Sequence, residues 1–152
     1  MIRTIYIFGA IAFLFLSCQN QQVKESQHLT GNYRLIESIT IKGEDTIHLV
    51  VDTTKMEMIK IFNPQYFSFF NHDKSKGTDS LNNVFVSGAG TYTLQGETYI
   101  ENLEYCSYRP WEGKQFTFTL EVKGDSLIQH GMEEIPELGV KQHITEKYVK
   151  LK

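Results

Sequence analysis

Apolar and polar side chains alternate along most of the chain after Gly31. The clearest case begins at Phe116, where Phe116, Phe118 and Leu120 alternate with Thr117 and Thr119. A period of two residues is typical of a β-strand with one face in a core and the other in water. This pattern therefore predicts strands, and none of the chain after Gly31 shows the longer period of an amphipathic helix.

The alternating segments come in pairs joined by short turns. Four turns are predicted from residues that favour them, at Lys42-Gly43, Asn63-Pro64, Gln95-Gly96 and Gly124-Asp125, and a last strand follows at about 142–151. Glycine supplies the positive φ of tight turns, and proline suits a turn because it lacks a backbone donor. Short connections favour antiparallel pairing, since parallel strands need long crossovers.

Eight or nine strands in series must manage their exposed edges, and closing the sheet into a barrel removes them. We therefore expect an all-β fold, an up-and-down antiparallel β-barrel of about eight or nine strands. A two-sheet β-sandwich is the alternative, because strand count alone does not exclude it. The Gly-rich segment 87–90 is expected to mark a strand bulge or bend. One helical turn is expected in the loop around Pro110 and Trp111.

The first residues follow a different pattern. About a dozen apolar residues follow Arg3 and end at Ser17-Cys18, which is shorter than the roughly 20 that span a membrane. A basic start, an apolar run and a small residue before a break are typical of a secretory signal. The alternative is a soluble secreted protein in which Cys18 is incidental.

The residues Leu16-Ser17-Cys18 resemble the signal of bacterial lipoproteins. That resemblance implies cleavage before Cys18, lipidation of Cys18 and a lipid-anchored protein of the cell envelope. In two-membrane bacteria it also implies the outer membrane, because Gln19 is not the Asp that often retains such proteins at the inner membrane.

Three regions are therefore expected: a lipoprotein-type signal peptide at 1–17, a lipidated cysteine with a flexible tether at 18–30, and one barrel domain at 31–152. The segment 19–28 contains a single aliphatic side chain, too little apolar surface to offset the entropy of ordering.

Composition narrows the possible functions. The net charge is −3, which gives no basic footprint for nucleic acid. Ten Phe and eight Tyr make the chain rich in rings. There are two cysteines, so a lipidated Cys18 leaves Cys106 without a disulfide partner.

The residues Gly31-Asn32-Tyr33 resemble the Gly-x-Trp opening of lipocalins, and 88–105 with 113–127 are similar to bacterial lipocalin-like lipoproteins. The resemblance implies a barrel with a cavity for a small apolar ligand. It also implies that a basic residue of the last strand packs over the ring of Tyr33, and Lys147 and Lys150 are the candidates.

One alternating set in the segment 98–106 carries more apolar mass than the other and is expected to face inward. The candidate cavity residues are this set and its neighbours on the following hairpin: Tyr99, Glu101, Leu103, Tyr105, Phe116, Phe118 and His130. A buried carboxylate such as Glu101 requires partners, and tyrosine hydroxyls or His130 are expected to supply them.

No catalytic signature is evident. The chain lacks HExxH, CxxC and Gly-x-Ser-x-Gly patterns, so we expect no enzyme, no metal and no cofactor. The expected function is a lipid-anchored envelope protein that binds a small hydrophobic or amphipathic ligand in its barrel. The alternative is a packed barrel that serves as a structural or protein-interaction domain.

Overall fold

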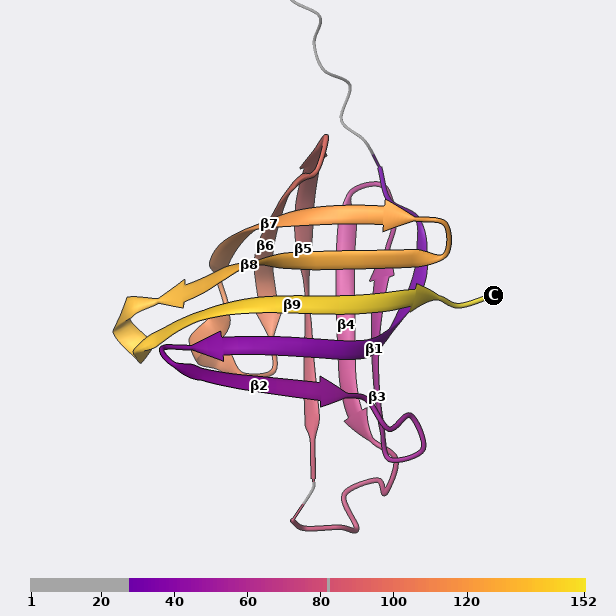
Figure 1. Cartoon of the computed structure of the whole chain (residues 1–152), viewed down its shortest axis with the longest axis vertical. Helices are drawn as coiled ribbons and strands as arrows, with labels where there is room; N and C mark the ends of the chain where they lie inside the picture. The colour runs from indigo at the N-terminus through magenta and orange to yellow at the C-terminus, as the bar shows by residue number, and fades with distance from the viewer. Residues whose placement is uncertain (1–27, 82) are drawn as a thin grey trace, which may run out of the picture.

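The computed structural model describes residues 28–81 and 83–152, and most of them belong to strands (Figure 1). The elements, in chain order, are β1 (Gly31–Lys42), β2 (Asp45–Val50), β3 (Met56–Phe62), β4 (Tyr66–Asp73), β5 (Phe85–Gln95), β6 (Thr98–Cys106), η1 (Arg109–Trp111), β7 (Lys114–Lys123), β8 (Ser126–Ile135), η2 (Pro136–Leu138) and β9 (Val140–Lys150). The two η elements are single turns of 3-10 helix.

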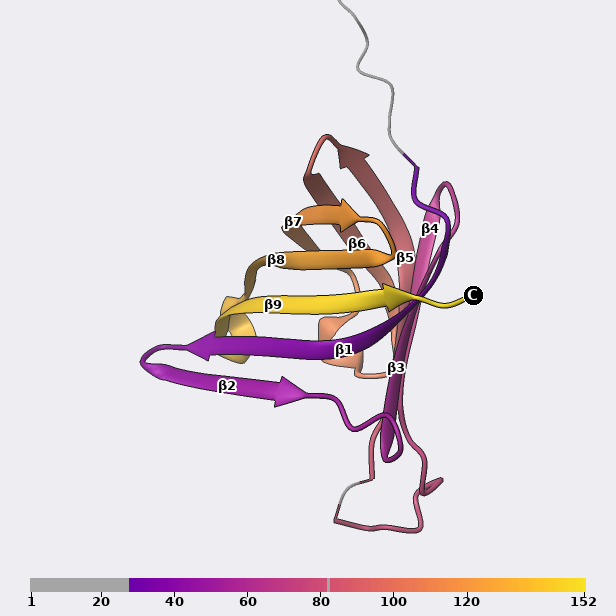
Figure 2. The same cartoon turned by 45° about the vertical axis from the view of Figure 1, so that its right-hand side comes forward.

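The strands form one antiparallel sheet in the order β2-β1-β3-β4-β5-β6-β7-β8-β9, and β1 also pairs with β9. That last pairing closes eight strands into a barrel, while β2 stands outside it beside β1 (Figure 2). The up-and-down, all-β prediction is confirmed, and the β-sandwich alternative is not adopted.

The predicted hairpins are also confirmed. Gly43, Gly96 and Gly124 have φ of 61°, 62° and 60° in the turns after β1, β5 and β7, a left-handed conformation that side chains disfavour. The turn at Asn63-Pro64 is held by Asn63 Oδ1, which accepts hydrogen bonds from the backbone N–H groups of Gln65 and Tyr66 at 2.9 and 2.8 Å.

A β-bulge interrupts the pairing of β5 with β6. Thr91 lies opposite Asn102 and Ala89 lies opposite Tyr105, so β6 has two residues where β5 has only Gly90. A Cβ atom on Gly90 would lie 1.8 Å from the carbonyl oxygen of Asn102. The bulge predicted for the Gly-rich segment is therefore present, and it requires glycine at residue 90.

The antiparallel order places alternate loops at opposite ends of the barrel. The closed end holds residues 28–30, the turns 63–65, 96–97 and 124–125, and the C-terminus. The open end holds the longer connections 74–81 with 83–84, 107–113 and 136–139.

Aromatic rings fill the closed end. Phe62 contacts Tyr33, Tyr92 and Tyr99 edge to face, with ring centroids 5.8, 5.6 and 6.1 Å apart. Leu29 seals this end, since its N–H donates to the Tyr92 hydroxyl at 2.9 Å and its side chain is buried. Such ring pairs stabilise a core beyond the area that they bury.

The predicted signal peptide, Cys18 and most of the predicted tether lie outside the described residues. Within the described part, the core begins at Leu29, two residues before β1. The eight strands of the barrel and the core between them lie within residues 28–152, which therefore contain the closed barrel. No helix in the described part of the chain is long and apolar enough to cross a membrane.

Gly90→Ala is expected to destabilise the barrel by more than the roughly 0.5–3 kcal/mol of an ordinary point mutation, because the new methyl group meets backbone that cannot yield without breaking the bulge. Urea unfolding of residues 28–152 measures the change. Gly96→Ala is the control. Its new Cβ meets nothing within 4 Å, so only the positive φ penalty of about 1–2 kcal/mol applies. Equal losses in the two variants would contradict the role of Gly90.

Candidate functional site

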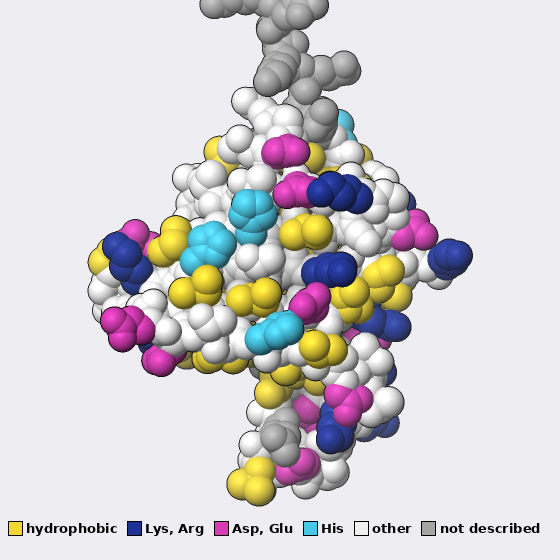
Figure 3. Space-filling model, viewed as in Figure 1, with side chains coloured by type: hydrophobic (Ala, Val, Ile, Leu, Met, Phe, Trp, Pro, Cys, Tyr) yellow, Lys and Arg dark blue, Asp and Glu magenta, His cyan; other side chains and the backbone are white. Residues whose placement is uncertain are grey.

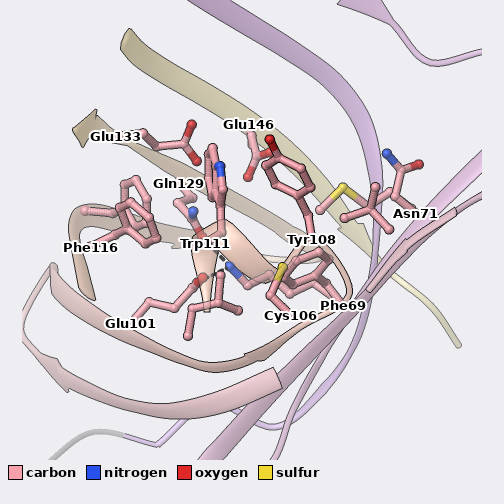
Figure 4. Close-up of a pocket in the computed structure, with 15 residues that line it drawn as sticks. Phe69, Asn71, Glu101, Cys106, Tyr108, Trp111, Phe116, Gln129, Glu133 and Glu146 are labelled. Atoms are coloured by element: carbon pink, nitrogen blue, oxygen red, sulfur yellow. Dashed lines mark hydrogen bonds and ion pairs between the residues drawn. The ribbon is translucent and has the colours of Figure 1, made fainter. Parts of the chain in front are cut away.

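The barrel encloses a cavity of about 400 Å³ in the half nearer the open end (Figure 4). Its walls are mostly apolar and include Phe69, Leu103, Phe116 and Phe118. A smaller polar set lines it as well, namely Lys60, Asn71, Glu101, Gln129, Glu133 and Glu146. The cavity thus combines an apolar body with a few polar groups, as is typical of small-molecule sites.

An ion pair forms the floor of the cavity. Lys60 Nζ donates to Glu101 Oε2 at 2.6 Å and to Gln129 Oε1 at 2.8 Å. The Tyr99 hydroxyl donates to the same Glu101 oxygen at 3.0 Å. These residues come from β3, β6 and β8, which are not neighbours in the sheet, so the contacts bridge the inside of the barrel.

Lys60 and Glu101 are almost completely buried, with side chains 4% and 8% exposed. The ammonium group also lies over three rings, 5.7 Å from the centroid of Phe62 and 5.2 Å from those of Phe67 and Tyr99. A buried ion pair is tolerable only when further hydrogen bonds satisfy it, and here the amide and the hydroxyl supply them. Burial, followed by the charge of Glu101, raises the pKa of Tyr99 well above its usual value, so this hydroxyl stays protonated as a donor.

Two more carboxylates face the cavity from the neighbouring strands β8 and β9. Glu133 accepts a hydrogen bond from Gln142 Nε2, and Glu146 accepts one from the Tyr148 hydroxyl, both at 2.7 Å. Burial raises the pKa of Glu133 to about 7 and also raises the pKa of Glu146. Both acids are therefore poised to hold a proton under conditions in which an exposed glutamate is ionised.

The loop between β6 and β7 lies at the mouth of the cavity. Tyr108 is 56% exposed and lines the cavity, so it marks where the cavity meets solvent. Trp111 packs on Phe116 with ring centroids 5.6 Å apart. Arg109 donates to both carboxylate oxygens of Glu112, which holds the η1 turn over the mouth.

The predicted cavity residues divide into two groups. Glu101, Leu103, Phe116 and Phe118 line the cavity, as expected from the alternation. Tyr99 points inward too, but it is fully buried in the closed half, where it contacts the cavity residues Glu101, Lys60 and Phe118 without lining the cavity itself. The expectation that a tyrosine hydroxyl satisfies Glu101 is confirmed.

The inward placement of Tyr105 and His130 is wrong. Tyr105 is 65% exposed because the bulge opposite Gly90 adds a residue and reverses the alternation beyond Leu103. His130 lies on the outer face of β8, where its ring is 6.2 Å from that of His143. Figure 3 shows histidine side chains on this outer surface among mixed charges. Glu101 is instead partnered by Lys60.

The predicted contact between the last strand and Tyr33 is made by Lys150. Its ammonium lies 6.0 Å from the ring centroid of Tyr33, and the two residues are paired across β1 and β9. Lys147 pairs with Glu37 instead, four residues further along β1, so it does not reach the Tyr33 ring.

Sequence reasoning missed Lys60, Glu133 and Glu146. A signal for Lys60 was present, since Met56, Met58, Lys60 and Phe62 share one face of a strand. The same period places Glu146 on the face of Ile144 and Tyr148. The signal for this site in the sequence is therefore a charged residue on a strand face whose other residues are apolar.

Cys106 is free, buried and part of the cavity wall. Within residues 28–81 and 83–152, no three His, Cys, Asp or Glu side chains are grouped so that they could hold a metal ion. Compared with family models, curated proteins and solved structures, the chain has no match.

The raised pKa of Glu133 predicts a pH-dependent stability. The pKa of the Glu133 carboxyl is near 4.5 in the unfolded chain and about 7 in the folded protein. The folded protein therefore binds this proton more tightly, which stabilises it at low pH, and that stabilisation is lost as the pH rises through about 7. The loss is at most about 3 kcal/mol, at about 1.4 kcal/mol for each pKa unit. Glu133→Gln, which cannot ionise, should therefore be more stable than the wild type at pH 8 and similar to it at pH 4.

Urea unfolding of residues 28–152 at the two pH values checks this expectation. Glu134→Gln is the matched control, because Glu134 is the next residue on the outer face and is exposed. A gain at pH 8 that is as large in the control would show that the effect is general surface charge and not the cavity carboxylate.

Proposed function

We propose that this chain is a lipid-anchored binding protein of the bacterial cell envelope, with a lipocalin-like barrel that holds a small hydrophobic or amphipathic ligand. The observation that carries the proposal is the cavity of about 400 Å³. Its size lies within the range of about 300–1,000 Å³ that is usual for small-molecule sites.

The distribution of polarity in the cavity supports the same function. Rings and aliphatic side chains form the walls, whereas the polar floor at Lys60 and Glu101 is already satisfied by the protein. An apolar ligand can therefore enter without breaking protein hydrogen bonds. The packed-barrel alternative is disfavoured because a domain evolved only for packing fills its interior at close to crystal density.

The proposed anchor at Cys18 would orient the mouth of the cavity relative to the membrane. Nine residues separate Cys18 from His28, and His28 reaches the closed end, where its ring hydrogen-bonds to the Pro64 carbonyl at 2.7 Å. The mouth beside Tyr108 and Trp111 is at the opposite end of the barrel. Lipid on Cys18 would thus hold the closed end near the membrane and leave the mouth open to the surrounding solution.

A substitution that fills the cavity tests the ligand site. Met58 lines the cavity and is half-buried, so Met58→Trp should place its ring in the open space and block binding of the neutral probe N-phenyl-1-naphthylamine. The wild-type barrel, residues 28–152, should bind this probe with roughly micromolar affinity, about −8 kcal/mol. Probe fluorescence measures the binding, and the melting temperature should change little.

Ile59→Trp is the control, since Ile59 is the next residue and faces outward on the same strand. It should leave probe binding intact. If the wild type binds no probe and Met58→Trp lowers stability by the roughly 1–3 kcal/mol of an overpacked core, the cavity is not a binding site.

The anchor is tested by lipid labelling in a bacterial host. The full chain should incorporate radioactive palmitate and partition into detergent, and Cys18→Ala should abolish both. Cys106→Ala removes the other cysteine and should leave both unchanged. Labelling that persists without Cys18 would refute the lipoprotein assignment.

A further inference from the structure

The charges that line the cavity do not balance. Of the described residues that line it, Glu101, Glu133 and Glu146 are acidic and Lys60 alone is basic. Lys60 and Glu101 are 2.6 Å apart and neutralise each other. Glu133 and Glu146 remain, and no further basic side chain in residues 28–81 and 83–152 lines the cavity to match them.

The protein satisfies these two carboxylates only in part. Among the described residues, each accepts one hydrogen bond from a neutral group, the Gln142 amide for Glu133 and the Tyr148 hydroxyl for Glu146. Across residues 28–81 and 83–152, neither of them forms an ion pair. A third acceptor that lines the cavity, Asn71 Oδ1 on β4, is buried and has no hydrogen-bond partner among the described residues. Unpaired buried acceptors of this kind are rare in folded proteins and call for a donor.

The strand register sets the two carboxylates at different depths. Glu146 lies opposite Gln129, close to the floor, and Glu133 lies opposite Gln142, closer to the mouth. Between them the wall is formed by the pair Gly131 and Ile144, and Gly131 adds no side chain. Figure 4 shows both carboxyl groups on the same side of the cavity. A ligand that lies along this wall would therefore be close to the Glu146 carboxylate near the floor and to the Glu133 carboxylate near the mouth.

We infer that the natural ligand is an apolar molecule that carries a protonated amine, held by the carboxylates of Glu133 and Glu146. This inference rests on the proposed function. A protonated amine supplies a positive charge and N–H donors for these two carboxylates, and hydrogen bonds to charged groups are about twice as strong as neutral ones. A fatty acid fits less well, because Lys60, the basic side chain that lines the cavity among the described residues, is already held by Glu101 and Gln129.

The raised pKa of both acids agrees with this assignment. Burial disfavours their ionised forms while the cavity is empty, and an incoming cation would favour them again. Charged groups that face this wall are Lys60 and Glu101 from the opposite strands and the two acids themselves. Lys60 is held at the floor by Glu101 and Gln129, so it does not replace the missing cation.

The test compares three probes of equal chain length, octylamine, octanol and octanoate. The full-length chain is used in liposomes of a neutral phospholipid, and binding is followed by the emission of Trp111, the only tryptophan of the chain, which lines the cavity. The quantity measured for each probe is the ratio of its apparent Kd in a variant to that in the wild type, so that partition into lipid cancels.

In the double variant Glu133→Gln and Glu146→Gln, octylamine should bind at least about tenfold more weakly, whereas octanol should bind unchanged and octanoate no more weakly than before. Unchanged octanol binding shows that the cavity persists. Each single variant should weaken octylamine binding by a smaller factor. The single variants replace the double variant in this test if the double variant does not fold. Glu134→Gln removes an exposed acid from the same strand and should have no effect.

Octylamine binding that survives the double substitution would overturn the inference, and octanol binding would still support the proposed function. Octanoate that binds the wild type more tightly than octylamine would overturn it as well. If none of the three probes changes the Trp111 emission, the ligand site and the inference both fail.

Discussion

One lysine inside the barrel determines how the interior is organised. Lys60 belongs to a face of β3 that otherwise carries Met and Phe. Because this face points into the closed barrel, the Lys60 side chain is buried inside it. A buried ammonium group costs several kcal/mol unless it is paired, so Glu101 and Gln129 from strands across the barrel must reach it. Removing one partner of such a pair typically costs about 3–5 kcal/mol, because the other charge is left alone.

This pair separates two halves with different roles. Below it, rings from Tyr33 to Tyr99 pack edge to face and seal the end at which residue 28 enters. Above it, the interior is open, and rings from Phe118 to Trp111 line the way to the mouth. A barrel of eight strands is just wide enough for either arrangement, side chains alone or a small ligand. Here the polar floor marks the change from one to the other.

The fold could be predicted because its determinants are local. The period of two residues, the glycine turns and the short connections are each visible in a few consecutive residues of the sequence. The site could be predicted only where the alternation was unbroken, as at Glu101 and Leu103. Tyr105 was placed wrongly because one extra residue opposite Gly90 reverses the face of everything that follows, and only the register reveals it. The partner of Glu101 was missed because Lys60 is 41 residues away in the chain and lies across the barrel.

The residues that conflict with a stable core are also those that suggest a function. Packing alone would favour apolar side chains at Glu133 and Glu146, since burial works against their charge. Sequences usually agree with their fold at every level, and the exceptions cluster at functional sites. A bound cation would remove the conflict, and a ligand at 100 times its Kd would add about 2.7 kcal/mol to the stability of the folded state. If such a ligand binds, the open half of the barrel would gain stability from it, whereas the ring-filled half is packed by its own side chains.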